Sequence, residues 1–154
     1  MTAEPRWTVR PAERGDFAVW RELFRQYGEF YRVEIPDERF ALVWSWIGDP
    51  SHEVNCLVVA GADGTPVGLA HYRPFARPLA GGVGCYLDDL FVDPAARGGG
   101  AVDALFARLR AIAVERGWNT VRWITADDNY RARSKYDQVA TRTPFLTYDM
   151  APEA

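Results

Sequence analysis

The chain has 154 residues, of which 48% are hydrophobic and 25% are charged, and its formal net charge is −3. This balance is typical of a soluble globular protein, and we predict a single domain over residues 1–154. An acidic chain lacks the basic footprint of a nucleic-acid-binding protein. The sequence shows neither a charged leader, which would indicate export, nor a run of about 18 apolar residues, which would indicate a membrane span. We therefore expect a cytoplasmic protein without nucleic acid or membrane partners.

The cysteines and histidines do not form a metal-binding pattern. Cys56 and Cys85 stand in apolar runs, and we expect both as small buried hydrophobic residues. His52 and His71 stand alone, so we expect neither a metal ligand nor a catalytic group at these positions. We therefore predict no metal.

Hydrophobic periodicity, turn residues and breakers predict the element order β-α-α-β-β-β-α-β-α-β. In chain order these are a strand at 7–11, a helix from Asp16 to about 31, a helix at 37–47, strands at 53–61, 66–75 and 83–93, a helix ending at Gly117, a strand at 120–125, a helix within 127–140 and a strand at 141–150. Asp16 is the predicted N-cap of the first helix, and Asp127 or Asp128 that of the last. Asp63-Gly64 indicates a hairpin turn. The fold class is α/β, with one central, mixed, mostly antiparallel sheet and helices on both faces.

The stretch "FVDPAARGGGAVDALF" places an arginine and three glycines between a predicted strand and a predicted helix. Glycine disfavours both kinds of structure, so a bare backbone must serve another purpose there. Free N–H groups and the dipole at a helix start bind anions, and Arg97 adds a full charge. We therefore predict a phosphate site.

Other interpretations of the glycines fit less well. A flexible surface turn is one alternative, and a fragment of an RNA-binding arginine–glycine tail is another, which the acidic chain disfavours. A P-loop would need a lysine after the glycines, and a dinucleotide fingerprint would need a glycine where Asp103 stands.

Two motifs then carry a family resemblance. "LDDLFVDPAARGGGAVDALF" resembles the acyl-CoA signature R/Q-x-x-G-x-G/A of GNAT-type N-acetyltransferases, with Arg97 and Gly100 in place. "ADDNYRARSKYDQVA" is similar to the family's N-x-x-A-x-x-x-Y helix, with Asn129, Ala132 and Tyr136 in place. The element order also resembles this fold over nearly the whole chain.

The family pattern is not matched everywhere. Val102 stands where the family prefers Gly or Ala at the end of the phosphate loop, and Lys135 stands where it often has Leu. The stretches "YLDDLFV" and "TPFLTY" resemble the polyamine- and histone-directed, diamine acetyltransferase-like branch of the family.

The resemblance implies that an acetyl group moves from acetyl-CoA to an amine by direct attack, with a general base and a general acid. Tyr136 is implied as the acid that protonates the leaving thiolate. Asp88 and Asp89 compete as the base, and strand alternation predicts that they face opposite sides, with Asp88 on the face of Tyr86, Leu90 and Val92. The similarity to the strand "YLEDFFV" of polyamine acetyltransferases favours Asp88, acting through a bridging water.

The resemblance also implies contacts to acetyl-CoA, the expected co-substrate. The backbone groups of one strand end would pair with the pantetheine amides, the N–H groups of the glycine loop would hold the pyrophosphate, and two residues of the later helix would complete the site. These are Leu90, Phe91 and Val92, then Arg97, Gly98, Gly99, Gly100, Ala101 and Val102, and finally Asn129 and Tyr136. Whether the donor is acetyl or a longer acyl group stays open.

The acceptor is expected near the first two helices. Glu29, Tyr31 and Glu34, together with Asp88, are the candidate substrate contacts, because acids and aromatic rings suit a cationic amine; a solvated loop is the alternative. We favour a polyamine-like small molecule with a primary amine. Acetylation of a protein lysine or N-terminus, and a catalytically silent acyl-CoA-binding sensor or interaction module, are the alternatives. The aromatic surplus and the apolar last strand predict a homodimer.

Overall fold

The computed structural model describes residues 6–153, and the chain divides into two compact units, Met1–Trp123 and Ile124–Ala154. The first unit holds β1 (Thr8–Pro11), η1 (Arg14–Asp16), α1 (Phe17–Phe30), α2 (Asp37–Ile47), β2 (Asn55–Ala60), β3 (Pro66–Arg77), η2 (Pro78–Ala80), β4 (Gly82–Val92), η3 (Pro94–Ala96), α3 (Ala101–Arg116) and β5 (Val121–Arg122). The second unit holds α4 (Tyr130–Val139). The four predicted helices are therefore confirmed. Among the described residues, no helix has the length and apolar character that crossing a membrane requires.

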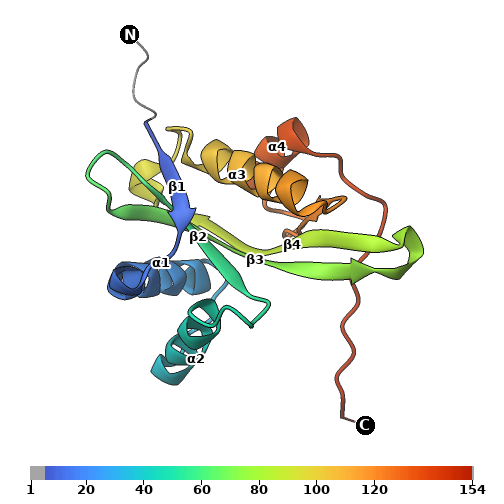
Figure 1. The fold of residues 1–154 in the computed structure, drawn as a ribbon, viewed down its shortest axis with the longest axis horizontal. Coiled ribbons are helices and arrows are strands. Elements are labelled where there is room, and N and C mark those ends of the chain that lie inside the picture. Colours follow the sequence, from blue (N-terminus) through green and yellow to red (C-terminus); the bar gives the residue numbers. More distant parts are fainter. Residues whose placement is uncertain (1–5, 154) are drawn as a thin grey trace. The chain divides into compact units, whose positions relative to one another are not determined.

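The sheet has five strands in the order β1-β2-β3-β4-β5 (Figure 1). β1 to β4 pair antiparallel with their neighbours, and β4 pairs parallel with β5. At the β2–β3 turn, Gly64 takes a φ of 80° and Asp63 Oδ1 accepts the N–H of Thr65 over 3.0 Å. The predicted hairpin turn and the mixed, mostly antiparallel sheet are confirmed.

Helices cover both faces of this sheet, as Figure 1 shows, with α1 and α2 on one face and α3 on the other. β2 contributes side chains to both hydrophobic cores, because alternate residues of a strand point to opposite faces. Leu57 and Val59 pack in the core under α3. Cys56 and Val58 pack in the core under α1 and α2. The predicted burial of both cysteines is confirmed, since Cys56 and Cys85 are buried and free.

The predicted last strand is wrong. Residues 141–150 form no strand, and the large apolar side chains of Phe145, Leu146, Tyr148 and Met150 are exposed. Their alternating, β-favouring composition is not sufficient, because a strand needs a neighbour to pair with. Pro144 also removes one backbone donor from the segment.

The predicted N-cap position of the first helix is confirmed, whereas that of the last helix is wrong. Asp16 stands at the N-cap of α1, but its carboxylate makes no capping hydrogen bond to that helix. It accepts the backbone N–H of Glu13 over 2.7 Å and pairs with Arg10 instead. α4 begins one or two residues later than expected, with Asn129 at the N-cap position in place of Asp128 or Asp127.

Candidate active site

The loop between β4 and α3 has the geometry of an anion site. Gly98 and Gly100 have φ angles of 80° and 94°, which residues with a Cβ rarely adopt. α3 begins directly afterwards at Ala101, and the first N–H groups of a helix have no acceptor within it. The indole Nε1 of Trp7 donates to the carbonyl oxygen of Gly99 over 2.6 Å. The indole of Trp7 therefore holds the loop from outside. The N–H groups at the start of α3 remain available to a ligand, and such groups bind phosphate.

One side chain of this loop and one in the first turn of α3 have structural partners. Arg97 Nε donates to the carbonyl oxygen of Val92 over 3.1 Å, and its guanidinium lies 5.6 Å from the ring centre of Phe91. Arg97 thus connects the loop to the end of β4 and adds positive charge there. Val102, which departs from the family pattern, packs against the core under α3.

Part of the edge of β4 has no strand partner among the described residues. β5 pairs with β4 only at Cys85 and Tyr86, whereas β3 continues to pair as far as Val92. β5 is thus shorter than the predicted strand at 120–125. The backbone groups of residues 87–92 that point away from β3 can therefore accept an extended ligand as an added strand. The predicted pantetheine contacts Leu90, Phe91 and Val92 lie on this stretch.

A β-bulge in β4 determines where the acidic residues point. His71 pairs with Asp89 and Tyr72 pairs with Leu87, so Asp88 is the extra residue of the bulge. Before the bulge, Leu87 packs in the core under α3. After it the alternation is inverted, and Phe91 packs in the core under α1 and α2.

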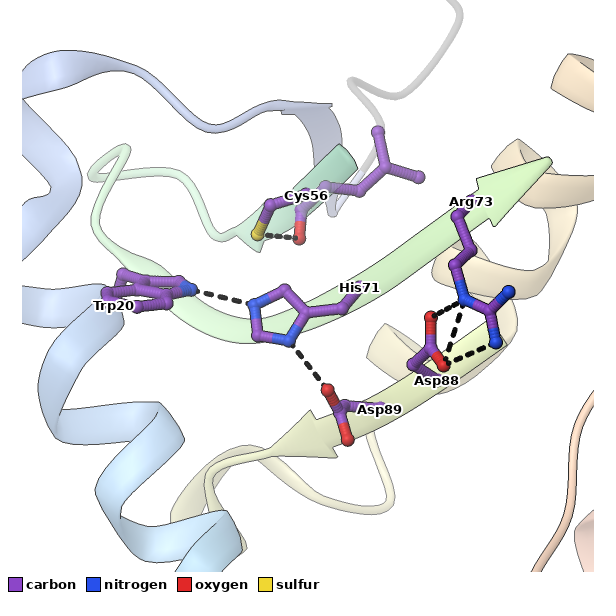
Figure 2. A network of polar contacts seen from close by, with 7 residues as sticks. Trp20, Cys56, His71, Arg73, Asp88 and Asp89 are labelled. Carbon is purple, nitrogen blue, oxygen red and sulfur yellow. Dashed lines mark hydrogen bonds and ion pairs between the residues drawn. The ribbon is translucent and has the colours of Figure 1, made fainter. Parts of the chain in front are cut away.

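The prediction that Asp88 and Asp89 face opposite sides is therefore wrong. Both carboxylates project from the face covered by α1 and α2, where Asp88 meets Arg73 and Asp89 meets His71 (Figure 2). Leu90, expected on the face of Asp88, packs toward α3 instead. Strand alternation in the sequence does not reveal a bulge, because the extra residue reverses the face on which each following side chain lies.

The environment of Asp88 combines burial with a salt bridge. Its carboxylate is 31% exposed, and Oδ2 lies 3.0 Å from Nε of Arg73. Burial raises the pKa of Asp88 above its ordinary value, Arg73 opposes this, and the neighbouring charge of Asp89 raises the pKa further. A carboxylate with a raised pKa beside an open strand edge is a suitable general base.

Comparison with known proteins places this geometry in a family. The model of the acetyltransferase (GNAT) family matches residues 20–139. The chain belongs to the GNAT acetyltransferase family. It is 28% identical over 144 residues to a D-amino-acid N-acetyltransferase of Saccharomyces cerevisiae, covering 93% of this chain and 89% of the relative. It is 29% identical over 139 residues to a thialysine N-epsilon-acetyltransferase of Bos taurus, covering 83% and 79%.

Solved structures confirm the fold. An aminoglycoside N-acetyltransferase crystallised with CoA superposes with a TM-score of 0.82 at 15% identity, over 99% of both chains. The predicted α/β fold class is thus confirmed, and the protein is an acetyl-CoA-dependent N-acetyltransferase.

The predicted acceptor contacts lie in different settings. Tyr31 follows α1, and burial followed by the charge of Asp89 raises its pKa, so its ring lies within electrostatic reach of that acid. Glu29 forms an exposed salt bridge with Arg25 over 3.0 Å, and Glu34 lies exposed in the loop before α2. Tyr31 therefore interacts with Asp89, and the roles of all three residues toward the acceptor stay predictions.

Asn129 and Tyr136 belong to the second unit. Asn129 is the N-cap residue of α4, and its carbonyl oxygen accepts the N–H of Arg133 over 2.9 Å. Tyr136 lies in the last turns of α4, where its carbonyl accepts the N–H of Ala140 over 2.8 Å. Their roles toward acetyl-CoA stay predictions. Across residues 6–153, no group of His, Cys, Asp and Glu side chains is arranged to hold a metal ion.

Sequence reasoning missed four residues of this region: Trp7, Trp20, His71 and Arg73. His71 was dismissed because it stands alone in the sequence, yet it contacts Trp20 and Asp89 in the structure (Figure 2). Strand alternation is a signal that puts His71 on one face of β3 with Arg73. The register between β3 and β4, which the sequence does not reveal, supplies its acidic partner.

Proposed function

We propose that the protein transfers an acetyl group from acetyl-CoA to the primary amine of a small, extended molecule such as a polyamine or a diamino acid. One observation supports this most strongly: the bulge places Asp88 and a second acid beside the stretch of β4 that has no strand partner. An acyl-pantetheine lying along that edge would bring its thioester close to these carboxylates. The names of the relatives, a D-amino-acid N-acetyltransferase and a thialysine N-epsilon-acetyltransferase, agree with a small amino-group acceptor.

Each predicted residue has a chemical task in this proposal. Leu90, Phe91 and Val92 pair through their backbone with the pantetheine amides. The amides from Arg97 to Val102 hold the pyrophosphate. Asp88 removes the ammonium proton, directly or through water, because only the neutral amine attacks. An alkylammonium has a pKa of about 10, so this step requires a base.

The later helix completes the proposed chemistry. Tyr136 donates its phenolic proton to the leaving thiolate, because a phenol stays protonated at neutral pH. Asn129 hydrogen-bonds the cofactor. Glu29, Tyr31 and Glu34 attract and orient the cationic acceptor. Residues 1–154 act as one acetyltransferase domain in this proposal, and the family match crosses the division between the two units.

The test is a turnover measurement. Purified protein is incubated with acetyl-CoA and, in turn, spermidine, thialysine and a D-amino acid, and free CoA thiol is recorded, while calorimetry measures acetyl-CoA binding. We expect micromolar acetyl-CoA binding and amine-dependent thiol release. Binding without turnover on any of these amines would favour the silent acyl-CoA-binding module, and turnover only with a lysine-containing peptide would favour a protein acetyltransferase.

We also propose a cytoplasmic homodimer. The exposed apolar side chains of Phe145, Leu146, Tyr148 and Met150 offer a surface that a second copy would cover. Light scattering of the purified protein is expected to give twice the mass of the chain, and a mass of one chain would contradict the dimer.

A further inference from the structure

A buried chain of hydrogen bonds runs from α1 through β3 to β4. Trp20 Nε1 lies 2.9 Å from His71 Nε2, and His71 Nδ1 lies 2.8 Å from Asp89 Oδ2 (Figure 2). Trp20 is fully buried and His71 is 2% exposed, whereas the Asp89 side chain is 23% exposed. The chain therefore leads from the core to an acid at the surface of the proposed site.

The chemistry of the indole fixes the protonation of the imidazole. An indole nitrogen can only donate, so His71 Nε2 has to accept and carries no proton. The ring proton then sits on Nδ1 and is donated to Asp89. Protonating Nε2 would set two N–H groups against each other in a buried site, which is unfavourable.

The other groups around His71 fit a neutral ring. Burial lowers the pKa of His71, but negative charge on Cys56 and Asp89 raises it more, and the net effect is a pKa of about 10. That rise requires a Cys56 thiolate and a proton on His71 Nε2, and the contacts of both groups are unfavourable for these states. Cys56 Sγ lies 3.4 Å from the carbonyl oxygen of Leu57, a contact in which only a thiol S–H can donate. The rings of Phe24 and Trp20 also lie beside the imidazole, at 4.8 and 5.9 Å between ring centres. With Cys56 as a thiol, Asp89 is the one charged group among the described residues that contacts the ring, and the Trp20 donor opposes its effect on the pKa of His71.

The neutrality of His71 decides the charge of the proposed acceptor site. Arg73, Asp88 and Asp89 together carry one more negative than positive charge when His71 is neutral. An imidazolium at His71 would cancel that excess, and the site would lose its attraction for a cation. The bulge brings both acids to the same face, so the two carboxylates can act on one ammonium group.

We propose that His71 is a positioning residue, held as the neutral Nδ1–H tautomer by the indole of Trp20, and that it fixes Asp89 beside Asp88 so that the two adjacent carboxylates receive the ammonium of the acceptor amine. This inference rests on the proposed function, because it assigns the acceptor to that site. It predicts that His71 transfers no proton during the reaction and contributes through the binding of the amine.

Matched variants separate positioning from proton transfer. In His71→Gln, the side-chain amide can still donate to Asp89 and accept from Trp20, but it cannot exchange a proton at neutral pH. His71→Leu has a similar size and keeps neither hydrogen bond. Acceptor KM for spermidine and thialysine, kcat, and the calorimetric acetyl-CoA affinity are measured for both variants.

We expect His71→Gln to keep the acceptor KM within about threefold of the wild type, and His71→Leu to raise it about tenfold, which corresponds to the loss of one charged hydrogen bond. Acetyl-CoA affinity is expected to stay unchanged in both, which also shows that they fold. A His71→Gln variant as impaired as His71→Leu would overturn the positioning role in favour of acid–base chemistry. An unchanged acceptor KM in His71→Leu would overturn it as well.

A spectroscopic measurement on the unmodified protein needs no variant to fold. Nitrogen-15 NMR of the histidine rings is expected to show His71 protonated at Nδ1 alone, without titration between about pH 6 and 8, on either side of the ordinary histidine pKa. Protonation of both ring nitrogens would overturn the neutral tautomer whatever the turnover. Absence of turnover with every amine would instead overturn the proposed function and the ammonium role with it, so the two failures are distinguishable.

Discussion

Arg73 Nε lies 3.0 Å from Asp88 Oδ2, so the proposed general base is held by a cation from the adjacent strand. The guanidinium also lies over the ring of Tyr86, 4.8 Å from its centre. Burial raises the pKa of Asp88, and Arg73 is the main group that opposes this. The arginine therefore keeps the base ionised at lower pH than burial alone would allow.

Replacing this arginine is expected to shift the pH dependence of the reaction. In Arg73→Gln the carboxylate loses the contribution that lowers its pKa, so Asp88 accepts protons at higher pH. Because the base must be deprotonated, the acidic limb of kcat/KM should move to higher pH. The measurement is a pH profile of kcat/KM with spermidine. Arg77→Gln, at the far end of β3 and bonded to Asn119, is the control and should leave the profile unchanged.

The glycine loop is expected to tolerate no Cβ at its left-handed positions. Gly100→Ala forces alanine to a φ near 94°, where strain amounts to about 1–2 kcal/mol, so the loop should relax and acetyl-CoA affinity should fall about tenfold. Calorimetry checks this. Gly81→Ala carries comparable strain at a φ of 62°, with open space around it at the β3–β4 turn. Equal loss of affinity in both variants would contradict a specific role of the loop.

The buried salt bridge at the start of α1 is expected to stabilise the fold. Asp16 is 7% exposed, and both of its oxygens accept from Arg10, at 2.7 and 3.0 Å. Asp16→Asn should lower the free energy of unfolding by about 2 kcal/mol at neutral pH, whereas Glu29→Gln, which breaks an exposed pair, should change it by less than about 0.5 kcal/mol. Urea denaturation measures both.

The same pair gives a pH dependence of stability. The hydrogen bond from Arg10 lowers the pKa of Asp16 below its ordinary value of 3.8, against the opposing effect of burial. A lowered pKa contributes stability that is complete above the unfolded pKa and is lost as the pH falls through the folded one. The difference between wild type and Asp16→Asn should therefore shrink as the pH falls below about 4. A difference independent of pH would contradict the ionic origin.

Tyr136 is expected to act in the chemical step. Tyr136→Phe removes the proton donor, so kcat should fall about 100-fold while the calorimetric acetyl-CoA affinity stays within about threefold. Tyr130→Phe, an exposed position on the same helix, should change neither. If Tyr136→Phe kept full kcat, another group would have to protonate the thiolate.

Much of the fold could be predicted from local patterns. The stripe from Phe17 to Tyr27 and the stop at Gly117 indicated helices that form almost as expected. The strand predicted at residues 141–150 is absent, because strand formation depends on a neighbouring strand and not on composition alone.

The site was only partly predictable. The glycine loop and Asp88 were visible because a motif is contiguous in sequence. The inverted face of Asp89 and the contacts of His71 were not, because both follow from one extra residue in β4 and from the β3–β4 register. Such details are set by strand pairing across 15 or more residues of sequence, as in the bond between Arg73 and Asp88.

The most direct test of the account compares the rate of CoA release by wild type and Asp88→Asn with acetyl-CoA and spermidine or thialysine. Asp63→Asn, in the exposed β2–β3 turn, is the control. We predict that Asp88→Asn lowers kcat at least about 100-fold while its acetyl-CoA affinity and the rate of the control match the wild type. A rate for Asp88→Asn within about threefold of the wild type would show that Asp88 is not the base and would contradict the central claim.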